Sequence, residues 1–210
     1  MERLKVKVCG MREGNNIRQV ESLGIDWMGF IFYPKSSRFV DSIPSYLPSS
    51  VKRVGVFVNA GLEYILGKVK EFSLDIVQLH GHETPEMVLQ VKNCLPSGTL
   101  VIKAFNIGTP DDLSPTEAYE GAVDYFLFDT KASLAGGNGT KFDWSVLSSY
   151  DGPTPFILSG GIGPEDAERV LSFSHPRLAG IDLNSRFEVS PGLKDPSLLA
   201  LFLDGLRSTK

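Results

Sequence analysis

The stretch Phe156-Ile157-Leu158-Ser159-Gly160-Gly161-Ile162-Gly163 places a short apolar run directly before a glycine-rich turn. The next apolar run along the chain, residues 178–183, likewise ends in a polar turn, Asn184-Ser185. In (β/α)8 barrels the turns after the last two strands commonly bind phosphate through backbone N–H groups. Gly160 and Gly161 could serve only to close a tight turn, but two such turns after successive strands favour a phosphate-binding barrel.

Similar apolar runs recur toward the N-terminus, and segments with helical periodicity separate them. The expected strands are residues 4–8, 27–32, 51–58, 76–79, 100–105, 125–128, 156–158 and 178–183. The expected helices are residues 15–23, 62–72, 85–94, 142–148, 164–173 and 196–207. The linkers around residues 42–47 and 110–119 look irregular. This alternation is typical of βα units on a parallel sheet.

An open doubly wound sheet is built from the same units, so polar residues at the strand ends must decide between the two folds. An open sheet gathers its functional groups at one switch point, whereas a barrel collects them around a ring. Polar residues are expected at the C-terminal ends of separate strands: Cys9, Asn59, Gln78 with His80, Lys103, Asp129, Ser159 and Asp182. We therefore predict a single (β/α)8 barrel domain over residues 1–210.

The composition is that of an ordinary globular protein, with 42% hydrophobic and 22% charged residues and a net charge of -4. A mildly acidic chain has no excess positive charge for nucleic acid. Because no apolar signal region or membrane-length window is found, we expect a cytoplasmic protein without a membrane partner. Cys9 and Cys94 are too few for a disulfide framework or a zinc site. The sequence leaves monomer and homodimer open.

Two further segments have alternative interpretations. His80-Gly81-His82 lacks a third ligand at a recognisable spacing, so we expect no metal. The segment Gly136-Gly137-Asn138-Gly139 suits a mobile lid or a loop whose backbone passes close to a ligand. A flexible, solvent-exposed connection fits that segment equally well.

Cys9 and Asp129 are the candidate catalytic pair. A base and an acid at the ends of different strands can relocate protons within one substrate. Taken singly, Cys9 fits a small buried hydrophobe and Asp129 a helix cap. Lys103 offers an alternative as the Schiff-base nucleophile of a lyase or aldolase acting on a sugar phosphate. Arg38 carries a fork that suits a carboxylate, although loop arginines are commonly solvated.

In their order along the chain, these motifs resemble those of the phosphoribosylanthranilate isomerase family, the (β/α)8 enzymes of tryptophan biosynthesis. The resemblance runs the whole chain through Lys7-Val8-Cys9-Gly10, Ser37-Arg38, Gly55-Val56-Phe57-Val58-Asn59, Val77-Gln78-Leu79-His80-Gly81, Asp129, the segments at 136–139 and 142–144, Ser159-Gly160-Gly161-Ile162, Gly180-Ile181-Asp182, Pro191-Gly192 and Lys194-Asp195. One departure is Asn184-Ser185-Arg186, where the family often has Ser-Ser-Gly.

The resemblance implies an Amadori rearrangement of N-(5-phosphoribosyl)anthranilate to 1-(2-carboxyphenylamino)-1-deoxyribulose 5-phosphate, a small phosphorylated substrate handled without a cofactor. It implies that Cys9 is the general base, with a pKa lowered by nearby positive charge, and that Asp129 is the general acid. It further implies that Arg38 binds the anthranilate carboxylate and that Asp182 contacts the sugar. The remaining implied contacts are Gln78 and His80 to substrate, and Gly160, Gly161, Asn184 and Ser185 to phosphate.

Overall fold

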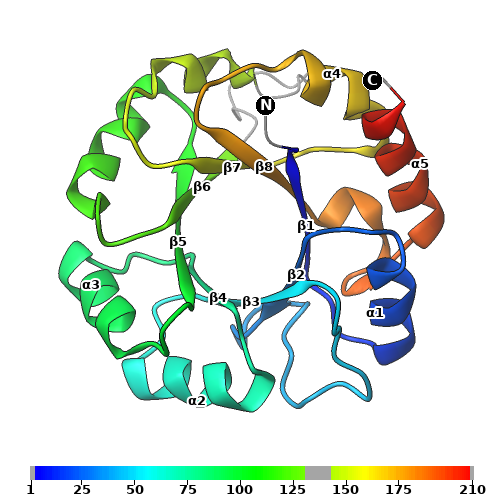
Figure 1. Cartoon of the computed structure of the whole chain (residues 1–210), viewed down its shortest axis with the longest axis horizontal. Helices are drawn as coiled ribbons and strands as arrows, with labels where there is room; N and C mark the ends of the chain where they lie inside the picture. The colour runs from blue at the N-terminus through cyan, green and yellow to red at the C-terminus, as the bar shows by residue number, and fades with distance from the viewer. Residues whose placement is uncertain (1–2, 131–142, 209–210) are drawn as a thin grey trace.

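The apolar runs form parallel strands that close into a barrel in the chain order β1 to β8, as Figure 1 shows in a view down the ring. The computed structural model describes residues 3–130 and 143–208. The strands are β1 (Lys5–Cys9), β2 (Trp27–Ile31), β3 (Lys52–Phe57), β4 (Ile76–Leu79), β5 (Leu100–Ile107), β6 (Tyr125–Thr130), β7 (Phe156–Ser159) and β8 (Leu178–Leu183). Because β1 pairs with β8, the barrel prediction is confirmed and the open sheet is wrong.

Helices surround the ring of strands (Figure 1). They are α1 (Gly14–Glu21), α2 (Leu62–Phe72), α3 (Pro85–Cys94), α4 (Ala167–Ser172) and α5 (Pro196–Arg207). The observed bounds of α2, α3 and α5 equal the predicted ones. Proline occupies the first turn of α3 and α5, where the missing N–H group costs no hydrogen bond. Among the described residues, no helix is long and apolar enough to cross a membrane.

The predictions failed mainly where tighter helices replace α-helices. The segments η1 (Pro110–Tyr119), η2 (Trp144–Ser149), η3 (Pro164–Asp166) and η4 (Ser185–Phe187) are 3-10 helices. The helix predicted at residues 142–148 is therefore wrong in type, and the one at 164–173 begins as η3 before α4. Residues 32–51, all of them described, contain no helix. Pro44 and Pro48 lie in that linker, and proline disfavours the helical conformation of the residue before it.

Alternation along the strands divides the buried side chains into two layers. One cluster fills the barrel interior and consists of Cys9, Trp27, Val54, Val56, Ile76, Ile102, Ala104, Leu127 and Ile157. A larger cluster, which includes Phe126, Phe128 and Phe156, lies between the strands and the helices. Side chains at the inward positions near the strand ends therefore face the mouth of the barrel.

After β8 the chain forms a short antiparallel hairpin of β9 (Glu188–Ser190) and β10 (Leu193–Lys194). Asn16 of α1 fastens β10 with two hydrogen bonds of 2.8 Å, one to the backbone carbonyl of Lys194 and one from its amide. The hairpin consequently lies next to α1 and the first strand. This arrangement brings two charged side chains, Glu188 and Lys194, toward the mouth of the barrel.

The turn after β7 depends on two glycines in the left-handed region, Gly160 with φ of 98° and Gly161 with φ of 66°. A Cβ atom on Gly160 would lie 2.6 Å from the backbone nitrogen of Thr130, and closer still to its carbonyl oxygen. Thr130 also donates its hydroxyl hydrogen to the carbonyl of Ser159 at 2.8 Å. The ends of β6 and β7 therefore touch at a point that admits only glycine.

We expect Gly160→Ala to destabilise the protein by at least about 3 kcal/mol, since a left-handed side chain costs about 1–2 kcal/mol and the contact with Thr130 adds overpacking. Gly121→Ala is a matched control, because Gly121 has φ of 78° and no atom within 4 Å of the added Cβ. The control should lose only about 1–2 kcal/mol. Urea unfolding of both variants measures the difference, and equal losses would contradict the close contact.

Candidate active site

A cavity of about 210 Å³ opens at the C-terminal ends of the strands. Most of the site residues expected from the sequence line this one cavity: Cys9, Gln78, His80, Asp129, Gly160, Gly161, Asp182, Asn184 and Ser185. Ile31 and Val56 contribute apolar surface to the same cavity. The expected lid glycines Gly136, Gly137 and Gly139 lie outside the described residues.

Cys9 and Asp129 reach the cavity from separate strands. Cys9 is the last residue of β1, which is shifted by one residue from the predicted strand, and Asp129 lies near the end of β6, which extends two residues beyond the predicted end. In Figure 1, β1 and β6 lie on different sides of the ring. The thiol packs against Gly29 of β2, where a Cβ atom would lie 2.8 Å from Sγ. A ligand in the cavity can therefore meet a thiol and a carboxylate from two directions.

A buried ion pair lies below the thiol. Lys7 precedes Cys9 by two residues, which places both side chains on the inward face of β1. Its ammonium donates to Asp182 Oδ1 of β8 at 2.9 Å, and both side chains are almost completely buried. Burial lowers the pKa of Lys7, but the charges of Asp182 and Cys9 outweigh it, so that this pKa is raised overall. Lys7 is thus held as a cation beside the sulfur.

The pKa of Cys9 is raised, contrary to the expectation from the sequence. Burial is the largest cause and favours the neutral thiol, and the charge of Asp182 acts in the same direction. The cations Lys7 and Lys194 oppose this shift without overcoming it. The neutral thiol is therefore the favoured form in the unliganded cavity.

A short polar chain leads to Asp129. Gln78 Nε2 lies 2.9 Å from His80 Nδ1, and His80 Nε2 lies 3.7 Å from Asp129 Oδ2. If the amide donates to Nδ1, the ring carries its hydrogen on Nε2 and points it toward the carboxylate. Gln78 Oε1 is buried at the cavity and has no hydrogen-bond partner among the described residues. A polar group of a ligand can satisfy that oxygen.

The turns after β7 and β8 line the opposite part of the cavity through Gly160, Gly161, Asn184 and Ser185. The side-chain oxygen of Asn184 accepts a hydrogen bond from Lys194 at 2.7 Å. Arg186 also lines the cavity, and its guanidinium lies 3.0 Å from Glu165, with both side chains about half exposed. The replacement of the usual glycine therefore adds a solvent-facing ion pair at the rim.

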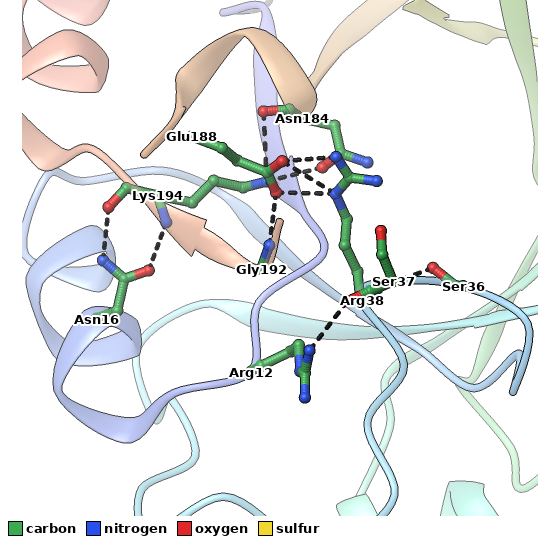
Figure 2. A network of polar contacts seen from close by, with 9 residues as sticks. All are labelled: Arg12, Asn16, Ser36, Ser37, Arg38, Asn184, Glu188, Gly192 and Lys194. Atoms are coloured by element: carbon green, nitrogen blue, oxygen red, sulfur yellow. Dashed lines mark hydrogen bonds and ion pairs between the residues drawn. The ribbon is translucent and has the colours of Figure 1, made fainter. Parts of the chain in front are cut away.

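Arg38 is not among the residues that line the cavity, and Figure 2 shows its side chain directed toward Glu188. Its Nε and Nη2 atoms donate to Glu188 at 2.9 and 2.6 Å. A Cβ atom on Gly10 would lie 2.7 Å from Arg38 Cδ, so the arginine packs against the residue that follows Cys9. The sequence placed Arg38 near the cavity but did not reveal that a carboxylate of the protein already occupies one edge of its fork.

Lys103 lies outside the cavity, so its expected place at a strand end is wrong. It occupies the middle of β5, on the face opposite to Ile102 and Ala104, which belong to the barrel interior. Its ammonium lies 3.2 Å from Glu83 Oε2 and donates to Gly81 O at 2.9 Å. Burial lowers its pKa, but it is fixed in the helix layer and cannot attack a ligand at the barrel mouth.

Within residues 3–130 and 143–208, no group of three His, Cys, Asp or Glu side chains is arranged to hold a metal ion. His82 does not line the cavity.

The active sites of (β/α)8 enzymes lie at the C-terminal ends of the strands, where this cavity lies. The fold and the cavity together define an enzyme of the (β/α)8-barrel class. A family model described as N-(5'phosphoribosyl)anthranilate (PRA) isomerase matches residues 6–205. The N-(5'-phosphoribosyl)anthranilate isomerase of Parabacteroides distasonis is 52% identical over 204 residues, which are 94% of this chain and 91% of that protein. The corresponding enzyme of Phocaeicola vulgatus is 50% identical, over 96% of this chain and 97% of its own length.

The chain therefore belongs to the N-(5'-phosphoribosyl)anthranilate isomerase family. It converts N-(5'-phosphoribosyl)anthranilate to 1-(2-carboxyphenylamino)-1-deoxyribulose 5-phosphate in tryptophan biosynthesis. The Schiff-base lyase or aldolase considered as an alternative is wrong.

Solved structures agree with this family. The phosphoribosyl anthranilate isomerase of Thermotoga maritima has a TM-score of 0.83 and 32% identity, over 98% of this chain and 100% of that one. Another structure, a phosphoribosyl anthranilate isomerase in complex with reduced 1-(o-carboxyphenylamino)-1-deoxyribulose 5-phosphate, has a TM-score of 0.81 and 30% identity, over 98% and 100% of the two chains. The Thermotoga maritima enzyme is described as dimeric.

Three charged residues at the site were missed by the sequence analysis as functional candidates: Lys7, Glu188 and Lys194. A signal for Lys7 was present, because a lysine at an inward position of an apolar strand needs a buried partner. Glu188 and Lys194 gave no comparable signal, since they lie on a hairpin that the apolar pattern did not predict. The contact between Glu188 and Arg38 joins residues far apart in the sequence.

We expect the thiol of Cys9 to titrate above the usual pKa of a cysteine in unliganded protein. Cys94→Ser removes the exposed second thiol and leaves Cys9 as the only reactive one. The rate of alkylation by iodoacetamide, followed against pH, should reach half its maximum above about pH 8.5. Lys7→Met should move the midpoint higher still, because the cation that lowers this pKa is lost while Asp182 remains. A midpoint below that of a free cysteine would contradict the dominance of burial.

Proposed function

We propose that Cys9 is the general base and Asp129 the general acid of the isomerisation. The observation that carries this assignment is that the two side chains line one cavity from different strands of the ring. The rearrangement requires a proton to be given to the furanose ring oxygen and another to be removed from C2. Groups that face a substrate from two directions can perform both transfers without moving the substrate.

In the proposed sequence, protonated Asp129 donates to the ring oxygen while the substrate nitrogen supplies electrons, and the C1–O bond breaks to give an iminium ion. Cys9 then removes the C2 proton, and the electrons of the C–H bond form an enolamine. The enolamine tautomerises to the ketone of the product. Since the substrate nitrogen accepts and returns the electron pair, no cofactor takes part in the proposed steps.

The environment of each group fits its proposed role. Cys9 must lose its proton for the second step, and Lys7 is the buried cation beside the sulfur that stabilises a thiolate. Once the proposed iminium ion has formed, the substrate is positively charged next to C2. This charge stabilises the thiolate of Cys9 further. On the other side, His80 lies between Gln78 and Asp129, which supports a role for both in orienting the acid and contacting the substrate.

The phosphate is proposed to bind at the turns after β7 and β8, which bring Gly160, Gly161, Asn184 and Ser185 to one part of the cavity. Backbone N–H groups in turns of this kind are common ligands of phosphate. The relative that was solved with a reduced, phosphorylated product supports a ligand of this class. Asp182 is proposed to contact the sugar from the cavity wall while Lys7 holds its other side.

Arg38 is proposed to bind the carboxylate of the anthranilate ring. Its Cδ atom would lie 2.7 Å from a Cβ atom on Gly10, and its charge interacts with that of Cys9. Five N–H groups are available on a guanidinium, and Glu188 engages only the edge formed by Nε and Nη2. The edge formed by Nη1 and Nη2 is the proposed binding surface for the substrate.

Three broader proposals concern the chain as a whole. Residues 1–210 are proposed to form one domain, because strands from both ends of the chain close the barrel. Either a monomer or a homodimer is proposed, and the dimeric Thermotoga maritima relative favours the second. The cytoplasm is the proposed compartment, supported by two free cysteines.

Cys9→Ala and Asp129→Asn should each lower kcat by about 10²–10⁴, the usual contribution of one general acid or base. Cys9→Ser should restore little, since a serine hydroxyl is too weak an acid to supply the base. Conversion of N-(5'-phosphoribosyl)anthranilate is followed by its anthranilate-type fluorescence under single-turnover conditions. Cys94→Ser is the control and should retain normal turnover, because Cys94 is exposed on α3. Near-normal turnover by Cys9→Ala would remove Cys9 as the base.

Arg38→Met should lower kcat/KM by at least about tenfold, equivalent to about 1.4 kcal/mol, through the loss of a charged hydrogen bond to the carboxylate. Arg18→Met is a control with the same change in charge, since Arg18 packs over Tyr46 on the helix surface. Steady-state kinetics with both variants measure the effect. If Arg38→Met behaves like Arg18→Met, the substrate carboxylate binds elsewhere.

A further inference from the structure

Glu188 is the centre of the polar network drawn in Figure 2. Its Oε1 atom accepts from Arg38 Nε at 2.9 Å, from Lys194 Nζ at 2.6 Å and from Gly192 N at 3.1 Å. Its Oε2 atom accepts from Arg38 Nη2 at 2.6 Å. One carboxylate therefore ties the loop after β2 to the hairpin after β8.

The network is buried and its parts are fixed from outside. The side chain of Glu188 is 4% exposed and that of Lys194 is completely buried, whereas that of Arg38 is 21% exposed. Asn16 holds the backbone of Lys194, and Ser36 accepts from the backbone amide of Arg38 at 3.1 Å. Burial raises the pKa of Glu188, but the hydrogen bonds from Arg38 and Lys194 lower it to about 2, so the group is a carboxylate at neutral pH.

The network contains two cations, Arg38 and Lys194, and one anion, Glu188. An isolated pair of Arg38 and Glu188 would be neutral and would attract a second carboxylate only weakly. Lys194 lies 2.6 Å from the same glutamate and adds one positive charge, so the three groups carry a net charge of about +1. This surplus is available at Arg38, the most exposed of the three.

The contact with Glu188 also fixes the orientation of the Arg38 guanidinium. Glu188 engages the Nε and Nη2 edge, which prevents the guanidinium from rotating about its last bonds. Of the three N–H groups that Glu188 does not engage, one of Nη1 and one of Nη2 form the adjacent edge. A planar carboxylate can approach that edge with two parallel hydrogen bonds while Glu188 stays in place.

We propose that Glu188 is a positioning residue for substrate recognition, which holds one edge of Arg38 so that the other edge binds the carboxylate of the anthranilate ring, with Lys194 preserving the positive charge. The proposal rests on the proposed role of Arg38. Glu188 is expected to increase the preference of the protein for ligands that carry this carboxylate. It makes no direct contact with the substrate.

The test compares the binding of two ligands by isothermal titration calorimetry. One is reduced 1-(o-carboxyphenylamino)-1-deoxyribulose 5-phosphate, and the other is the same reduced compound without its carboxyl group. The ratio of the two Kd values measures carboxylate recognition alone, because the sugar and phosphate are shared. The unmodified protein should prefer the carboxylated ligand by at least about tenfold, as expected for a charged, bidentate hydrogen bond.

Glu188→Ala should reduce this preference by at least about fivefold and change the Kd of the ligand without carboxylate less than about twofold. Glu188→Asp, which keeps the charge, should restore part of the preference. Glu165→Ala is the matched control, since Glu165 pairs with Arg186 at the rim of the same cavity, and it should leave the ratio unchanged. If Glu188→Ala does not fold, Glu188→Gln serves instead, because an amide offers only one acceptor to the two cations.

Comparison of the Glu188 and Arg38 variants distinguishes a failure of the role proposed for Glu188 from a failure of the role proposed for Arg38. A preference that survives in Glu188→Ala but is lost in Arg38→Met would overturn the role of Glu188 and support that of Arg38. A preference that survives in Arg38→Met would overturn both. Equal weakening of the two ligands in Glu188→Ala would show that the glutamate only stabilises the hairpin, which also contradicts the proposal.

Discussion

The pairing of β1 with β8 is the constraint on which the rest of the molecule depends. It closes the ring and places Lys7 opposite Asp182 in register, so that the first and last strands share a buried ion pair. Removing either partner would leave an isolated charge in the barrel, which costs several kcal/mol. The same pairing brings Cys9, at the end of β1, beside the polar turn that follows β8. Barrel closure therefore brings the two ends of the chain together at the cavity.

This closure also determines which charges lie near the thiol. Lys7 lies below Cys9 within the barrel, and the hairpin after β8 carries Lys194, whose charge also lowers the pKa of Cys9. Each cation is paired with a carboxylate, Lys7 with Asp182 and Lys194 with Glu188, which it shares with Arg38. A thiol surrounded by paired ions gains less from them than from free cations, and burial then dominates its pKa. The sequence showed the lysines but could not show that both were paired.

Most of the fold could be predicted because each strand is an apolar run and each long helix has a clear start. Proline and a capping side chain fix the beginnings of α3 and α5, for example. The 3-10 segments could not be predicted, since short tight helices lack a distinctive apolar period. At the site, the predicted strand ends located Cys9 and Asp129 at the cavity, because all the parallel strands of a barrel end at one face. The position of Lys103 was predicted wrongly because β5 continues to Ile107. The lysine therefore lies in the middle of the strand and faces the helices.

The two buried charge clusters differ in a way that suits different tasks. Lys7 and Asp182 form a neutral pair, and a neutral pair changes the local field without attracting an anion from solvent. Arg38, Glu188 and Lys194 carry a surplus of one positive charge, which does attract an anion. The neutral pair lies under Cys9, the group proposed to take a proton. The charged cluster lies behind the group proposed to bind the carboxylate, which remains an anion throughout the reaction. Gly10 and Cys9 lie between the two clusters. The positive charge proposed to bind the carboxylate and the groups proposed to transfer protons can therefore lie close together at one small cavity.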